Sequence, residues 1–261
     1  MPSLSSVLQR VTNGALRQAQ AVGDRHPGVA RGWYRVAAHF TPFVLTSLRQ
    51  NRLVAEHALT RLEWGRGRRR AALNHGWTWY VGLRTALGSE HPSTGLAGLQ
   101  LALMHQAAGA DAMAYGLFHA CLPTLERRGP AGDWSRLWAL SSLAEVATRL
   151  AQHPTPDQPN AVTWGGTATI WRAARDLALA LQLDDYPTSE IRRFRHTPAD
   201  VVPRPIVDLA GVPFYAHLLQ GYIVAARQAG DIEAASAATL ELDLFRSRIV
   251  GPESARDWYA W

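Results

Sequence analysis

Apolar residues recur at helical spacing along almost the whole chain, and the strict alternation that marks a half-buried strand persists nowhere. Helices with one apolar stripe must pack against other helices, and short connections between them favour antiparallel neighbours. We therefore expect an all-α fold of about nine to ten helices, packed as antiparallel hairpins in a bundle-like or irregular helical-repeat-like domain. The expected helices span residues 3–20, 29–39, 41–64, 68–87, 93–108, 112–128, 133–151, 161–183, 206–229 and 232–249.

Glycine, proline and aspartate mark the ends of these helices. Residues 106–111 (Gln-Ala-Ala-Gly-Ala-Asp) and 228–231 (Gln-Ala-Gly-Asp) form two similar junctions, in which glycine should end one helix and aspartate should cap the next. Asp133 is likewise expected to cap a helix, and Pro123 to kink its helix or end it early. Such junctions are typical of helical-repeat proteins, but no fixed period links the two copies.

The 261 residues are expected to form a single domain, 1–261, with a possible internal boundary at the proline-rich residues 153–160. Residues 184–205 form a long segment without helical pattern, and residues 251–261 form an aromatic tail. The single cysteine, Cys121, excludes an internal disulfide and is predicted to be a buried apolar filler. The chain has no apolar run of about 18 residues and no signal-peptide pattern at its start, so we expect a cytoplasmic protein.

All 27 basic residues are arginine, so every basic side chain is a permanent planar cation suited to carboxylates, phosphates or aromatic faces. Residues 1–75 hold twelve arginines against three acids, a net charge of +9, whereas the remainder has a net charge of −3. This basic first third could bind nucleic acid, anionic lipid or an acidic protein surface, or it could dock on the acidic remainder of the chain.

The spacings that catalytic and metal sites require are absent from the sequence. Neither Glu-x-x-His nor His-Glu-x-x-His occurs, and no Gly-x-Ser-x-Gly elbow is present. The glycines around Arg66 follow a helix and lack both the third glycine of a dinucleotide loop and a P-loop lysine. We therefore expect no metal and no cofactor, and we lean away from an enzyme.

Three features remain as candidates for partner binding. The first is a group of four arginines at a helix start. Positive charge at this end of a helix is unfavourable because of the helix dipole, unless a nearby anion compensates it. The second is the long loop, since such loops are often binding loops, and the third is the aromatic tail. The candidate residues are Arg66, Arg68, Arg69 and Arg70; Arg192, Arg193, Arg195 and His196; and Trp258 and Trp261.

Tryptophan is abundant, with ten residues in the chain. Trp77, Trp134, Trp138 and Trp171 occupy apolar helical stripes and are interpreted as core residues whose indole N–H groups need partners.

Residues 164–185, in which Trp-Arg-Ala-Ala-Arg-Asp at 171–176 runs into Asp184 and Asp185, resemble the terminal helix of some helical bacterial immunity proteins paired with polymorphic toxins. The resemblance covers about a twelfth of the chain and contains no diagnostic motif. It implies an inhibitor-type binding role, although an inhibitor of a basic nuclease would be expected to be acidic.

The leading hypothesis is a non-catalytic α-helical interaction module (an adaptor, immunity-type inhibitor or accessory subunit) that binds a protein with an acidic surface. The alternative is an enzyme or small-ligand binder with a pocket between helices lined by Trp and His, for which His105, His119 and His217 are the candidates. Nucleic-acid binding ranks last, because no recognition motif accompanies the basic charge.

Overall fold

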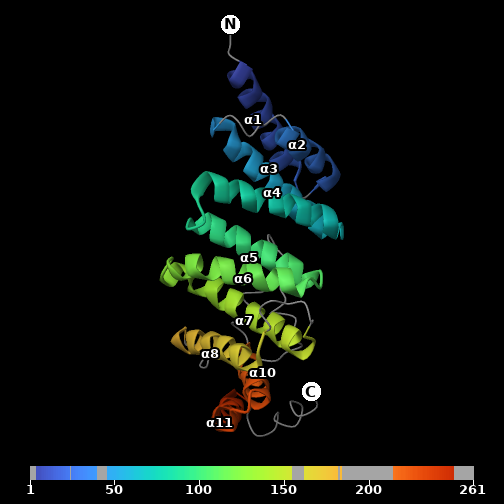
Figure 1. Cartoon of the computed structure of the whole chain (residues 1–261). Helices are drawn as coiled ribbons and strands as arrows, with labels where there is room; N and C mark the ends of the chain where they lie inside the picture. The colour runs from blue at the N-terminus through green and yellow to red at the C-terminus, as the bar shows by residue number, and fades with distance from the viewer. Residues whose placement is uncertain are drawn as a thin grey trace. The chain divides into compact units, whose positions relative to one another are not determined.

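The computed structural model describes residues 4–23, 25–39, 46–154, 162–181, 183 and 214–249, and these residues form ten α-helices and no strand. The all-α fold of antiparallel helical hairpins predicted from the sequence is therefore confirmed (Figure 1). The helices are α1 (Leu4–Val22), α2 (Pro27–His39), α3 (Thr46–Gly65), α4 (Arg69–Leu87), α5 (Pro92–Ala107), α6 (Asp111–Glu126), α7 (Pro130–Gln152), α8 (Trp164–Ala180), α10 (Phe214–Gln228) and α11 (Ile232–Ile249). None of these helices is both long enough and apolar enough to cross a bilayer.

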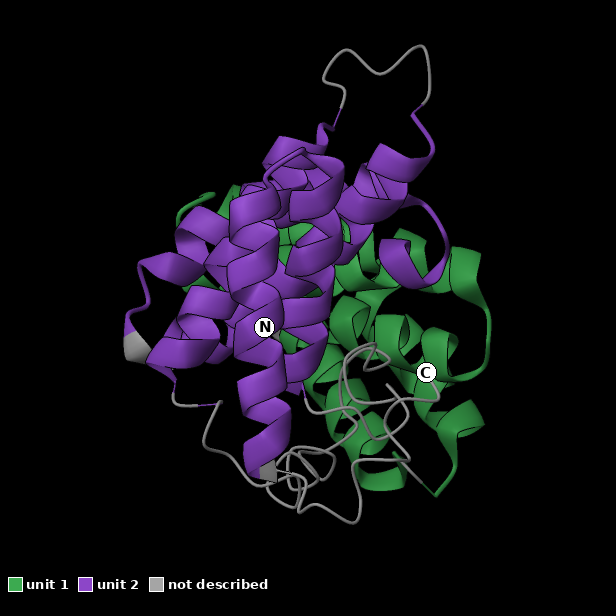
Figure 2. Cartoon of the chain, turned by 90° about the horizontal axis from the view of Figure 1, so that it is seen from below, with its two compact units in different colours: residues 1–104 green, residues 105–261 purple. Residues whose placement is uncertain are grey.

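The chain divides into two compact units, Met1–Met104 and His105–Trp261, which Figure 2 shows in different colours. In unit 1, helices α1 to α4 each pack on the next one along the chain. In unit 2, the same holds for α6, α7, α8, α10 and α11. Contacts also join α1 to α3 and α7 to α10, so alternate helices touch as well. The expected single domain with a possible boundary at residues 153–160 stays a prediction.

The same glycine turn follows three of the helices. Gly67, Gly109 and Gly230 have φ angles of +72°, +75° and +80°, a region that is open to glycine at little steric cost. In each turn the backbone N–H that follows the glycine donates to a carbonyl five residues earlier, as in Ala110 N to His105 O at 2.9 Å. This pattern is the Schellman motif, and it satisfies carbonyls that the end of a helix leaves without partners. The two predicted glycine stops are confirmed, and Gly67 adds a third.

The aspartates that follow these glycines behave differently. Asp231 caps α11, because its Oδ1 accepts a hydrogen bond from Ala234 N at 3.1 Å. The predicted cap at Asp111 is wrong: Asp111 is the first residue of α6, and its two oxygens accept hydrogen bonds from Arg149 Nε and Nη2, both at 2.8 Å. An arginine with a planar pair of donors is a stronger partner for a carboxylate than a single backbone N–H.

The start of α7 also differs from the prediction. The helix begins at Pro130, after Gly129, because proline suits the first helical position, where no N–H donor is required. Asp133 therefore lies in the first turn of α7 and is not its cap. Trp134 is 42% exposed, so its predicted core position is wrong. Pro123 lies inside α6, which ends three residues later at Glu126.

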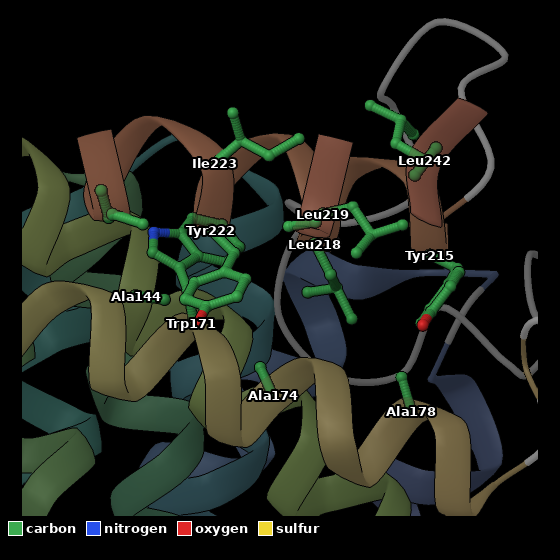
Figure 3. Close-up of a cluster of buried hydrophobic side chains, with 14 of the residues drawn as sticks. Ala144, Trp171, Ala174, Ala178, Tyr215, Leu218, Leu219, Tyr222, Ile223 and Leu242 are labelled. Atoms are coloured by element: carbon green, nitrogen blue, oxygen red, sulfur yellow. The ribbon is translucent and has the colours of Figure 1, made fainter. Parts of the chain in front are cut away.

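The core of unit 2 is built from α7, α8, α10 and α11 around Trp171. Trp171 is 2% exposed, which confirms its predicted core position, and its Nε1 donates a hydrogen bond to Thr148 Oγ1 at 3.0 Å. Figure 3 shows the α8 side chains Trp171, Ala174 and Ala178 facing the apolar side chains of α10. Small residues on α8 let α10 approach closely.

An ionic cluster on the same helices joins α8, α10 and α11. Glu241 on α11 accepts hydrogen bonds from the buried Tyr215 hydroxyl and from Arg175 Nη2, the latter at 2.6 Å. Burial, followed by the Glu241 carboxylate, raises the pKa of Tyr215 well above its ordinary value of 10.0, so the phenol stays protonated and donates. The cluster joins the middle of α11 to α8 and α10.

In unit 1, His57 on α3 stacks on Trp79 of α4, with ring centroids 4.2 Å apart and an interplanar angle of 17°. Burial, and to a lesser extent the charge of Arg61, lower the pKa of His57 from 6.5, whereas a hydrogen bond with Gln100 raises it by a smaller amount. The folded protein therefore favours the neutral form of this imidazole.

We predict that Gly221→Ala destabilises the protein by about 1–3 kcal/mol, the usual cost of overfilling a core. A Cβ at Gly221 would lie 2.5 Å from Cε2 and Cζ2 of the Trp171 indole. The matched control is Gly116→Ala in α6, where a Cβ would meet nothing within 4 Å and the helix should gain about 0.5–1 kcal/mol. Urea unfolding of both variants checks the prediction, and equal stabilities would contradict it.

We predict that the free energy of unfolding falls as the pH drops below 6.5, and that His57→Phe weakens this dependence. Because the folded-state pKa of His57 is lowered, the unfolded chain binds more protons in that range, and acid shifts the equilibrium toward unfolding. Urea unfolding at several pH values between about 7.5 and 5.5, on either side of the ordinary histidine pKa, measures the slope. His57→Gln cannot titrate either and should share the flatter slope whatever its stability; a wild-type slope in both variants would refute the assignment.

Candidate functional site

The structure of unit 1 depends on a carboxylate that is completely buried. Glu63 on α3 is 0% exposed, and an isolated charge in such a place would be strongly unfavourable. Arg31 contacts it directly, and Arg35 Nη2 and Arg68 Nη1 each lie 3.7 Å from one of its oxygens. Arg31 and Arg35 are one turn apart on α2, whereas Arg68 lies just before α4. One buried carboxylate thus interacts with cations from the helix that precedes α3 in the chain and from the turn that follows it.

A second carboxylate lies two helical turns earlier on the same face of α3. Glu56 is also buried, and its Oε2 is 2.7 Å from His75 Nδ1 on α4. Its other oxygen, Oε1, lies 3.7 Å from Arg52 Nε, one turn earlier on α3. Seven residues separate Glu56 from Glu63, which places both on one helical stripe.

The cluster carries more positive than negative charge. Among the described residues, the two carboxylates of the cluster, Glu56 and Glu63, are contacted by four guanidinium groups: those of Arg31, Arg35, Arg52 and Arg68. Two buried anions therefore neutralise two of the four cations, and the remainder gives this part of unit 1 a local positive field. A field of this sign favours anionic ligands and acidic surfaces.

A pocket of about 520 Å³ opens beside this cluster, between α2, α3 and α4. Arg35, Arg52, Glu56 and His75 line one part of it. Val36, Ala38 and Leu59 supply apolar wall, and His39 at the end of α2 completes the lining among the described residues. The pocket therefore combines charged donors with apolar surface, as small-ligand sites commonly do.

The four arginines predicted at the start of α4 are exposed around the α3–α4 turn, and we call Arg66, Arg68, Arg69 and Arg70 the arginine patch. Arg68 reaches the buried Glu63. The guanidinium carbon of Arg69 lies 3.8 Å above the Trp64 ring, a cation–π contact. The acidic partner that a basic helix start requires is thus supplied within the chain for Arg68, while the patch as a whole faces solvent.

The three histidines proposed for a pocket occupy different surroundings. His105 is buried near the end of α5, and His119 is exposed on α6, where it packs edge-on against Tyr115. Burial lowers the pKa of the His105 imidazole, and the protein atoms that cover part of the His119 ring lower its pKa too. His217 on α10 lies 3.1 Å from Glu145 of α7 and edge-on to Trp171. None of the three lines the pocket of unit 1.

Glu145 joins two other residues of unit 2. Its Oε1 contacts His217 of α10, and its Oε2 accepts a hydrogen bond from Gln106 Nε2 at 2.9 Å. These contacts help to hold α10 on α7 within unit 2. Within the described residues, no group of three or more His, Cys, Asp or Glu side chains could hold a metal ion.

Cys121 is 3% exposed, and burial raises the pKa of its thiol to about 12. The predicted buried position of Cys121 is therefore confirmed, and the raised pKa favours the protonated thiol near neutral pH.

The loop and tail candidates lie outside the described residues: Arg192, Arg193, Arg195 and His196 in the long loop, and Trp258 and Trp261 in the tail. They stay predictions.

Sequence reasoning missed the two buried glutamates and their partners on α2 and α4. One signal was available: Glu56 and Glu63 are the only acids between residues 25 and 75, and they are seven residues apart on a predicted helix. Isolated acids in a strongly basic region are good candidates for buried ion-pair centres. The arginines that pair with them could not be chosen from the ten in this region without the packing of α2 on α3.

No protein-family model matches the chain, and no curated protein matches it. Among solved structures, the chain is similar to the nearly identical TPR-like repeats of a kinesin light chain from Podosopora anserina, with a TM-score of 0.55, 16% sequence identity and coverage of 93% of this chain and 96% of that one. A single-residue variant of the same repeats gives a TM-score of 0.55 at 15% identity, covering 95% and 98%.

BtubC (BKLC) from P. vanneervenii gives a TM-score of 0.49 at 14% identity, covering 94% of this chain and 91% of that one. At the identities of the Podosopora anserina structures, the likeness shows the fold alone. The described helices pack as consecutive pairs in a TPR-like helical-repeat fold.

Proposed function

We propose that the chain is a non-catalytic helical interaction module that binds a protein partner through an acidic surface of that partner. Helical-repeat folds present binding surfaces built from side chains of successive helix pairs. The observation that carries the proposal is the exposed arginine patch of the α3–α4 turn, next to a cluster with more cations than anions. An adaptor, an immunity-type inhibitor and an accessory subunit are roles that such a module serves.

The chemistry of the patch favours carboxylates on the partner. Each guanidinium presents paired donors that match a carboxylate, and arginine is less strongly hydrated than lysine, so it loses less on entering an interface. Arg69 is held over Trp64, which restricts its motion before any partner arrives. A partner with acidic side chains would gain association rate and specificity from these charges.

The loop and tail candidates belong to the proposal as separate partner-binding residues. Arg192, Arg193, Arg195 and His196 would add positive charge, and Trp258 and Trp261 would add aromatic anchors of the kind that dominate binding energy in interfaces. Their part in binding is tested by separate substitutions and does not bear on the arginine patch.

The alternative, an enzyme or small-ligand binder with a pocket between helices, has one observation in its favour. The pocket of unit 1 lies between helices and is lined by His39 and His75. These histidines are not the ones that the sequence suggested, and a bound metabolite would be required to prefer this function.

We predict that Arg66→Glu, Arg69→Glu and Arg70→Glu together weaken the complex with the protein partner at least tenfold, or about 1.4 kcal/mol. The partner is first identified by native mass spectrometry as a stoichiometric second polypeptide on protein purified from its own source. Arg68 is left unchanged, because its reversal would place a second carboxylate beside the buried Glu63. Titration calorimetry then measures the affinity of each variant.

The matched control reverses Arg10, Arg17 and Arg25, three exposed arginines of unit 1, and so changes the net charge equally. This control should keep most of the affinity, and the patch variant should also lose salt dependence, since exposed charges are screened by salt. Equal losses in both triple variants would reject the patch as the contact. A small-molecule adduct on a lone chain would favour the alternative function, and nucleic acid in place of the polypeptide would overturn the proposal.

A further inference from the structure

The pocket of unit 1 has features that partner binding through the arginine patch does not use. Its lining and the patch share no residue, so a ligand in the pocket and a protein on the patch would use different side chains. A volume of about 520 Å³ lies within the range of small-ligand sites. The lining therefore decides which chemistry fits.

Arg35 is the cation of the cluster best placed to bind a ligand. Its Nη2 lies 3.7 Å from Glu63 Oε1, beyond hydrogen-bond distance, and Arg31 contacts the same oxygen more closely. The Arg35 side chain is 56% exposed and lines the pocket. Glu63 would keep Arg31 and Arg68 if the Arg35 guanidinium turned to a second anion.

The acidic group in the pocket is already engaged. Glu56 has His75 on one oxygen and Arg52 near the other, so its charge is compensated inside the protein. The contact of His75 with Glu56 uses Nδ1 and leaves Nε2 as a further polar group on a ring that lines the pocket. The field that a ligand would meet is therefore positive, and it selects an anion.

The rest of the lining is apolar. Val36 and Ala38 are partly buried and contribute hydrocarbon surface, whereas Leu59 is almost completely buried and adds little. A bare inorganic anion would leave this surface without a partner, whereas a ligand with a short hydrocarbon part would remove it from water.

We propose that this pocket binds a carboxylate carried on a short apolar body, with the carboxylate on Arg35 and the hydrocarbon against Val36 and Ala38. A free organic acid has this chemistry, and so does a glutamate between two apolar residues of a partner protein. The proposal stands independently of the arginine patch, because it does not require that the patch binds anything.

The test is isothermal titration calorimetry of the full chain with hexanoate, 1-hexanol and acetate as probes. Hexanoate is expected to bind saturably, and the other two at least tenfold more weakly, because each lacks one half of the recognised chemistry. Arg35→Gln should weaken hexanoate binding at least tenfold, and Arg35→Lys should restore part of it. The matched control is Arg84→Gln, which removes an exposed arginine of α4 that does not line the pocket and should leave binding unchanged.

Circular dichroism melting separates loss of the site from loss of the fold, and Arg35→Gln should melt close to the wild type because Glu63 keeps two arginines. If Arg35→Gln unfolds, Val36→Ala serves as the second variant and should weaken hexanoate binding but leave acetate unchanged. Failure of hexanoate to bind, or binding unaffected by both Arg35→Gln and Val36→Ala, would overturn the proposal.

Two peptides distinguish the sources of the carboxylate: acetyl-Ser-Gly-Leu-Glu-Leu-Gly-Ser-amide and its analogue with glutamine in place of glutamate. Competition with hexanoate by the first peptide and not by the second supports the proposal with a protein side chain as the source. Hexanoate binding without competition from either peptide supports it with a free organic acid as the source. Equal competition by both peptides would overturn it, because the carboxylate would then contribute nothing.

Discussion

The burial of Glu63 is the constraint on which the structure of unit 1 depends. A carboxylate with no exposed surface is tolerated only when cations surround it, and here they come from α2 and from the turn before α4. The ion pairs therefore fix how α2 and the α3–α4 turn lie against α3. Removal of one partner from a buried ion pair lowers stability more than replacement of the whole pair by apolar residues does. Several arginines around one carboxylate reduce the stability that is lost when any one of them is removed.

In unit 2, the helices are held together mainly by close packing of complementary side chains. Trp171 fits against α10 because position 221 is a glycine, and alanines on α8 let the facing leucines of α10 approach. Polar contacts such as that of Glu145 with His217 help to hold α10 on α7. Each unit therefore holds its antiparallel helix pairs together in a different way. Unit 1 relies on buried ion pairs, whereas unit 2 relies on small residues that pack against a large indole.

The sequence predicted the helices well because each depends on local rules: apolar spacing, glycine stops and proline starts. The same rules predicted the core position of Trp171 and the buried position of Cys121. They failed where a distant side chain competed with a local one, as at Asp111, whose carboxylate binds Arg149 and not its own helix. The residues that line the pocket could not be predicted for the same reason. They come from three helices, and no spacing within one helix indicates which arginine of α2 lies near α3.

The many arginines of unit 1 differ in what they contact. Arg31 is committed to the buried Glu63, and its charge is compensated inside the protein. Arg35 is exposed, lies 3.7 Å from that carboxylate and lines the pocket, whereas Arg66 and Arg70 are exposed and do not line it. The arginines of unit 1 therefore include a cation paired with a buried carboxylate, an exposed cation on the pocket wall and a solvent-facing patch, and the contacts of each guanidinium distinguish the three.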